Sequence, residues 1–167
     1  MKRHLPLLAV MLLAALFLVS CKPATQPTTP TPAQPGATEV PAGDTIKIGL
    51  NTELTGSIPV VGQSCKNAAE FAVKQINDAG GVDVGGTKMK VELLTEDNED
   101  KAESAAAVAQ KLNSSGVLAM IGPNASRNAI PAAQVAESAT MPMISPWATA
   151  PKLTIDQRTQ QPLKYVF

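Results

Sequence analysis

The chain has 167 residues, enough for one domain of ordinary size, with 14 basic and 14 acidic side chains. A formal net charge of zero gives no electrostatic reason to expect a nucleic-acid partner. Aromatic residues are scarce and alanine is abundant, so we expect slim helices that pack close to whatever they cover.

The first twenty residues are typical of an export signal rather than of a folded segment. A basic start, MKRH, precedes the apolar run Leu5–Val19, whose length of about 15 residues is less than the ~20 that a spanning helix needs. The run leads into Leu-Val-Ser-Cys, ending at Cys21, which resembles the bacterial lipobox. We expect residues 1–20 to be removed and Cys21 to carry a lipid anchor; a general export signal with an accidental cysteine is the alternative.

Residues 21–43 are predicted to be a tether. Proline and threonine dominate this stretch, which has too few large apolar side chains to fold. Proline keeps such a segment extended at about 3.1 Å per residue, for a reach of ~70 Å at most. A glycosylated stalk or a plain spacer is the alternative, and both are linkers. We expect the tether to hold a folded domain, residues 44–167, clear of the membrane on its extracytoplasmic side.

The mature chain lacks the side chains of common catalytic sites. The only histidine, His4, leaves with the signal, which excludes histidine-assisted nucleophiles and histidine metal ligands. No Gly-x-Ser-x-Gly elbow and no phosphate-binding loop is present. We therefore expect a protein that is not an enzyme and has no cofactor; chemistry by carboxylates or lysine is the alternative. Cys65 is expected to pack in the core or to form a disulfide with a cysteine outside this chain.

From residue 44 onward, strand and helix patterns alternate. In chain order they predict a strand at 46–50, a helix at 63–77 ended by Gly80–Gly81, and a strand at 89–95 after a Gly85–Gly86 turn. A helix with a capping box of Asp100 and Glu103 follows, and then a strand at 117–121 that is buried on both faces. The last elements are a helix from Ser126 with Pro131 near its first turn, a strand at 141–145, and the start of a fifth strand at 165–167.

This order predicts an α/β fold, a doubly wound parallel sheet with helices on both faces. In such a sheet the ligand lies beyond the carboxyl ends of the strands, where helix N-termini point. The candidate site therefore lies in three loops, 51–62, 122–126 and 145–149.

Four motifs, in order and with natural spacing, carry a resemblance to a known family. They are IGLNTELTG at 48–56 with a Gly-Gln helix start at 62–63, INDAGGV at 76–82, IGP at 121–123 and PMISPWAT at 142–149. Together they resemble the N-terminal portion of periplasmic leucine/isoleucine/valine-type (type I) solute-binding proteins of ABC importers. The resemblance covers residues 44–167.

The resemblance implies a two-lobed clamshell whose Rossmann-like first lobe grips the head group of an amino acid. It implies that Ser126 binds the carboxylate, that Thr149 reaches the carboxylate and the ammonium group, and that Trp147 offers a backbone carbonyl. A helix N-terminus favours an anion, and hydroxyl groups can donate to it. The alternatives are a plain N-cap for Ser126, a turn residue for Thr149 and core packing for Trp147 instead of a pocket wall.

The function implied is a lipid-anchored, monomeric protein of the periplasm or cell surface that delivers an amino acid or a related molecule to the membrane subunits of an ABC importer. A sensor domain is the main alternative, although one lipid anchor cannot pass a signal inward; a truncated remnant is another. We expect the second lobe, and the segments that complete the first, to lie after Phe167. Residues 44–167 alone are expected to be poorly soluble and to bind no amino acid tightly.

The intact mass of the mature protein, extracted from the membranes of its native host, tests these expectations. We expect Cys21 as the first residue, acyl chains on it, and a total mass well above that of residues 21–167. A mass equal to those residues plus lipid would contradict the expected second lobe. A protein without acyl chains would contradict the anchor.

Overall fold

The structure is a computed structural model that describes residues 45–167; the predicted signal, tether and lipidated Cys21 lie outside the described residues. One sheet is formed by β1 (Thr45–Thr52), β2 (Val82–Val84), β3 (Thr87–Asp97), β4 (Ala119–Ile121) and β5 (Met143–Ile144), in the order β2-β3-β1-β4-β5. The pairs β1–β3, β1–β4 and β4–β5 are parallel. The predicted doubly wound α/β fold is confirmed, and an unpredicted antiparallel strand, β2, makes the sheet mixed.

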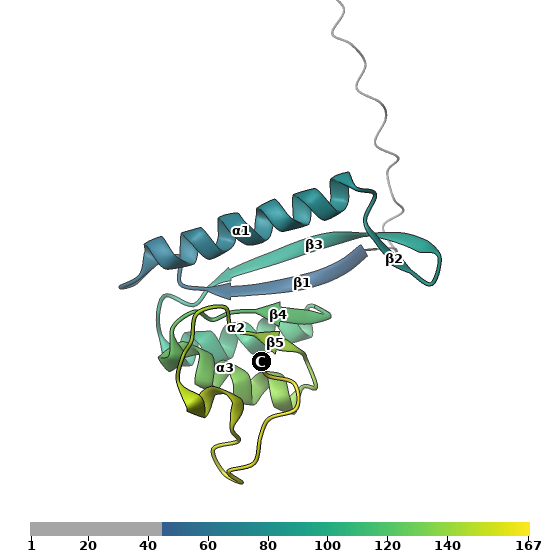
Figure 1. Ribbon diagram of the computed structural model, residues 1–167. Coiled ribbons are helices and arrows are strands. Elements are labelled where there is room, and N and C mark those ends of the chain that lie inside the picture. Colours follow the sequence, from purple (N-terminus) through teal and green to yellow (C-terminus); the bar gives the residue numbers. More distant parts are fainter. Residues whose placement is uncertain (1–44) are drawn as a thin grey trace, which may run out of the picture. The chain divides into compact units, whose positions relative to one another are not determined.

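The helices cover both faces of the sheet (Figure 1). Helix α1 (Pro59–Asp78) packs on β1 and β3 from one side, whereas α2 (Ala102–Ser114) and α3 (Ser126–Ser138) lie together on the other side. The chain runs from β1 outward to β3 and then returns to β4 on the opposite flank of β1. The strand order thus reverses between β1 and β4, and doubly wound sheets bind ligands at the carboxyl ends of the strands at such a point.

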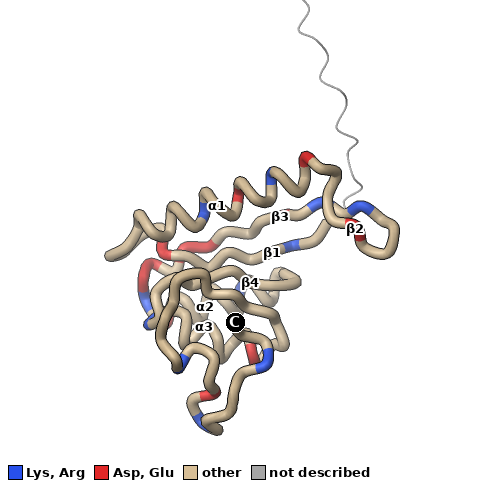
Figure 2. Tube along the Cα trace, in the orientation of Figure 1, with Lys and Arg blue, Asp and Glu red and all other residues tan. Residues whose placement is uncertain are grey.

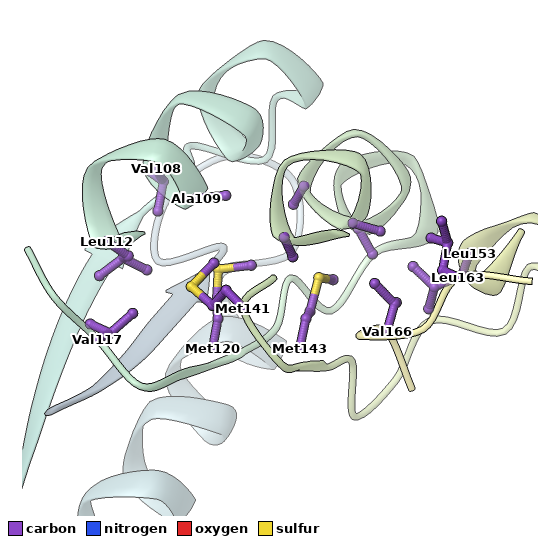
Figure 3. Close-up of a cluster of buried hydrophobic side chains, with 14 residues drawn as sticks. Val108, Ala109, Leu112, Val117, Met120, Met141, Met143, Leu153, Leu163 and Val166 are labelled. Carbon is purple, nitrogen blue, oxygen red and sulfur yellow. The ribbon is translucent and has the colours of Figure 1, made fainter. Parts of the chain in front are cut away.

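Tight packing between α2, α3 and the sheet forms the core (Figure 3). Alanines at the helix interface are fully buried and let the two helices approach closely, as the composition predicts; they are Ala105, Ala109, Ala129, Ala132, Ala133 and Ala136. Leu112 reaches β1 at Gly49, where an added Cβ would lie 2.9 Å from its Cδ1 atom. The 3-10 helix η1 (Pro151–Thr154) adds Leu153 to this core.

The opposite face of the sheet is much less covered. Between α1 and strands β1, β4 and β5 runs an apolar groove of about 520 Å³, lined by Val73, Met120 and Ile144 among others. Leu118 is 65% exposed and β4 begins only at residue 119, so the prediction of a strand at 117–121 buried on both faces is wrong. The reason is that, within the described residues, α1 is the helix on this face of the sheet, and it packs on β1 and β3. The half of the face formed by β4 and β5 is therefore left largely uncovered.

Several helix and strand boundaries differ from the sequence prediction. Helix α1 starts four residues early, at Pro59, which suits a first helical position because proline lacks an N–H to satisfy. The capping box is wrong: Lys101 is the N-cap of α2, and no side chain caps that end. Pro131 lies inside α3 and not near its first turn. Strand β5 is only Met143–Ile144 long.

Other predicted features are confirmed. Helix α3 begins at Ser126, and Gly80 and Gly81 follow the end of α1 with φ of +99° and +96°. Val166 pairs in parallel with Met143, which extends the sheet beyond β5 as predicted. None of the described helices is both long and apolar enough to cross a membrane.

Gly62 lets α1 pack its first turns directly on the chain that leaves β1. An added Cβ there would overlap the backbone carbonyl oxygen of Glu53. We expect Gly62→Ala to lower the free energy of unfolding by about 1–3 kcal/mol through overpacking, measured by urea denaturation. The neighbouring Gln63→Ala changes an exposed helix position and should cost almost nothing. Equal stability of the two variants would contradict the close contact.

Candidate functional site

A pocket of about 420 Å³ opens at the carboxyl ends of β4 and β5. Its lining residues are Asn124, Ala125, Ser126, Arg127, Trp147 and Thr149. The three residues predicted from the sequence to bind ligand, Ser126, Trp147 and Thr149, therefore lie at one pocket. Of the three predicted loops, 122–126 and 145–149 form its walls, while 51–62 lies beside and beneath them.

Ser126 links the two pocket loops. Its Oγ atom accepts hydrogen bonds from the backbone N–H of Thr149 at 3.2 Å and of Ala150 at 3.3 Å. It is the first residue of α3, whose N-cap is Ala125, so the plain N-cap interpretation is wrong. Both acceptor positions of the hydroxyl are used, and its proton has no acceptor among the described residues. Ser126 thus has one donor left for a ligand.

Trp147 and Thr149 line the pocket from the loop after β5. Trp147 is 56% exposed, which contradicts core packing and agrees with a pocket wall. Thr149 is also exposed. Ser145 fixes this loop, since its hydroxyl donates to the Pro123 carbonyl at 2.6 Å and accepts from the Ala148 N–H at 3.3 Å.

Beneath the pocket lies a set of buried polar residues that we call the buried polar cluster. Its members are Asn51, Thr52, Glu53, Asn98, Asp100, Asn124 and Asn128. They come from the ends of β1 and β3 and from the start of α3, three places distant in sequence. Sequence reasoning missed this cluster. Its available signal was the repeated occurrence of asparagine and acidic residues directly after predicted strands, in NTE, DNED and PNASRN.

Glu53 lies at the centre of the buried polar cluster with no exposed surface. Its Oε1 atom accepts from the Ala125 N–H at 3.1 Å and the Asn128 side chain at 3.0 Å. Its Oε2 atom accepts from the N–H and the side-chain amide of Asn124, at 3.3 and 2.8 Å. Every partner is a donor, as an ionised carboxylate requires.

Two further carboxylates hold the loop that follows β1. Asp97 accepts the backbone N–H groups of Leu54 and Thr55 at 3.0 and 3.2 Å, and Asp100 accepts that of Ser57 at 3.1 Å. Figure 2 shows acidic residues gathered where β3 ends and in the loop after it.

Hydrogen bonds lower the pKa of both aspartates against the opposing effect of burial. Desolvation by burial raises the pKa of Asp100, but hydrogen bonds from Ser57, Asn128 and Arg127 outweigh it and lower this pKa below its ordinary value. Burial also favours a higher pKa of Asp97, but the hydrogen bonds from Thr55, Glu99 and Leu54 outweigh this effect, so the pKa of Asp97 is lowered too. Asp100 also holds the guanidinium group of Arg127 at the pocket.

Two glycines allow the loops to converge on the buried polar cluster. Gly56 and Gly122 adopt φ of +94° and +82°, which favours glycine. A Cβ at Gly56 would overlap the Cβ of Asp100, and one at Gly122 would overlap the carbonyl oxygen of Asn51. The backbones are therefore closer than any side chain at these two positions would permit.

Cys65 is half-buried on α1, near the buried polar cluster. Burial raises the pKa of its thiol, and the charge of Glu53 adds to this, although a hydrogen bond with Asn124 opposes it. A thiol with a raised pKa is a poor nucleophile, which agrees with the packing interpretation. Within residues 45–167, no three acidic, cysteine or histidine side chains are grouped to hold a metal ion.

The lowered pKa values of Asp97 and Asp100 imply that stability depends on pH. Their contribution is complete above the unfolded-state pKa of about 3.9 and is lost as pH falls through the lower folded-state values. We expect urea denaturation to show stability falling below about pH 4. Asp97→Asn and Asp100→Asn should each be less stable at neutral pH and lose less on acidification. This account would be contradicted if the free energy of unfolding fell with pH as steeply in both variants as in the unchanged protein.

Comparison with known proteins agrees with this fold. Residues 45–162 match the family model described as periplasmic binding protein. The Leu/Ile/Val-binding protein BraC3 of Rhizobium johnstonii is 38% identical over 109 residues, covering 65% of this chain and 29% of that protein. The leucine-, isoleucine-, valine-, threonine- and alanine-binding protein of Pseudomonas aeruginosa is 36% identical over 113 residues, covering 68% and 29%.

Solved structures give the same result. The branched-chain amino acid transporter substrate-binding protein LivJ of Streptococcus pneumoniae, determined in complex with isoleucine, superposes with a TM-score of 0.64 and 38% identity, covering 74% of this chain and 33% of that one. The chain thus spans about a third of the length of these relatives. On the strength of the family match and the shared fold, the chain belongs to the periplasmic binding protein family.

Proposed function

We propose that the protein is an extracytoplasmic solute-binding protein whose pocket at α3 binds the carboxylate of an amino acid or a related small molecule. The observation that carries the proposal is the convergence of Ser126, Trp147 and Thr149 on one pocket. Membership of a family of binding proteins supports binding rather than catalysis.

The donors that face the pocket suit a carboxylate. The Ser126 hydroxyl has both acceptor positions filled and one proton to give. The backbone N–H groups of Ser126 and Arg127 have no acceptor among the described residues, and they lie at the positive end of the α3 dipole. A ligand carboxylate would satisfy these donors, and the exposed Thr149 hydroxyl adds another.

The names of the relatives support a class of ligand. Two are named for binding leucine, isoleucine and valine, one of them also for threonine and alanine, and a solved relative holds isoleucine. We propose an α-amino acid as the ligand of this protein. We also propose that it acts as a monomer, that a lipid on Cys21 anchors it outside the cytoplasm, and that it passes its ligand to an ABC importer.

A fluorescence titration tests the pocket, because Trp147 lines it and is the only tryptophan of these 167 residues. Protein purified from its native host would be titrated with leucine, isoleucine, valine, threonine and alanine. We expect at least one of them to change the tryptophan emission saturably. Ser126→Ala should weaken that binding about 10- to 100-fold, since a hydrogen bond to a charged group contributes ~1.5–3 kcal/mol.

Ser138→Ala is the matched control, since Ser138 ends the same helix and donates only to the Gln134 carbonyl. It should bind as the unchanged protein does. No saturable response to any of the five amino acids would refute an amino-acid ligand. Equal losses in Ser126→Ala and Ser138→Ala would refute the proposed role of this pocket.

A further inference from the structure

Glu53 is a buried carboxylate directly behind the pocket, and the ligand contacts proposed above do not use it. We infer that Glu53 is the positioning residue of the site: it fixes the start of α3 so that the next donors along the chain face the pocket. The expected effect of Glu53 on ligand binding rests on the proposed function. Its expected effect on the position of the α3 start does not.

The hydrogen bonds divide the N–H groups at the start of α3 into two sets. Those of Asn124 and Ala125 point inward to the two oxygens of Glu53, at 3.3 and 3.1 Å. Those of Ser126 and Arg127 have no acceptor in the described part of the chain. Because Glu53 occupies the inner pair, a ligand can reach only the outer pair.

Glu53 is itself held firmly, so it can fix the residues bound to it. It directly follows β1, and its backbone carbonyl packs against Gly62 of α1, where no side chain would fit. The adjacent Thr52 accepts from the side chain of Asn124 at 2.9 Å. Glu53 therefore ties the ends of β1 and the start of α1 to the start of α3, across the point where the strand order reverses.

The four donors around Glu53 require an acceptor at both of its side-chain oxygen positions, which a carboxylate provides. Each oxygen of Glu53 accepts two N–H groups. A glutamine of the same shape would place an NH₂ group against two of these donors, leaving them unpaired and buried. Glu53→Gln is therefore a nearly isosteric change that should release one side of the α3 start.

The matched control is Asp97→Asn. Asp97 also accepts several backbone N–H groups, but those belong to Leu54, Thr55 and Glu99 and not to α3. Both substitutions replace a carboxylate by an amide. In Asp97→Asn the amide oxygen can still accept all three backbone N–H groups, because all three go to Oδ1, so this variant tests the loss of a carboxylate charge by itself. Only Glu53→Gln should alter the start of α3.

The experiment measures two quantities in protein purified from the native host. The first is hydrogen exchange at the Asn124 and Ala125 amides, resolved by mass spectrometry with electron-transfer fragmentation. The second is the dissociation constant for leucine or whichever of the five amino acids binds most tightly. We expect Glu53→Gln to speed exchange and to weaken binding, each at least tenfold. Asp97→Asn, although less stable than the unchanged protein, should leave both quantities within twofold.

Unchanged exchange in Glu53→Gln, or equal effects of Glu53→Gln and Asp97→Asn, would overturn the inference. If the unchanged protein binds none of the amino acids, the proposed function fails, and the exchange rates alone decide the positioning role. If Glu53→Gln does not fold, Asn128→Ala removes one donor to Oε1 from a residue outside the pocket lining. It should speed exchange at Ala125 more than at Asn124, and the reverse order would count against Glu53.

Discussion

The carboxylate of Glu53 is the interaction on which the arrangement of the site depends. A charge without contact to water is costly unless donors surround it, and here four donors do so. Three of the four come from the first residues after β4, so burying Glu53 requires that the start of α3 lie against the end of β1. The close backbone contacts at Gly56, Gly62 and Gly122 make that convergence possible.

Charge is distributed around the same point in a way that supports the pocket. The start of α3 carries the positive end of its dipole and the Arg127 guanidinium group. Glu53 and Asp100 balance both from the buried side. The outer N–H groups and the proton of the Ser126 hydroxyl have no acceptor within residues 45–167. Acceptors thus hold the start of α3 from its buried side, while free donors of Ser126 and Arg127 lie at the pocket, and this asymmetry favours an anionic group in the pocket.

The two faces of the sheet differ in packing. Small side chains on α2 and α3 fill one face closely, whereas the groove beside α1 leaves Ile144 and Phe167 more than half exposed. The pocket at the carboxyl edge is bounded by α3 and the loop after β5, which belong to the well-packed side. The residues proposed to bind ligand are therefore attached to the more closely packed side of the described domain.

The sequence by itself determined the features that depend on local pattern. Alternation of strand and helix gave the α/β fold, the residue types at 126 gave the start of α3, and the strand ends gave the loops that hold Ser126, Trp147 and Thr149. It failed where a residue's role depends on its neighbours in space. The local pattern predicts a helix cap at Asp100, but the carboxylate of Asp100 binds Ser57 and Arg127. The pattern also predicts that Leu118 is buried, whereas it is exposed. Only the tertiary structure decided that Glu53 lies beneath α3, because strand order sets which loops meet, and strand order is not written in any local pattern.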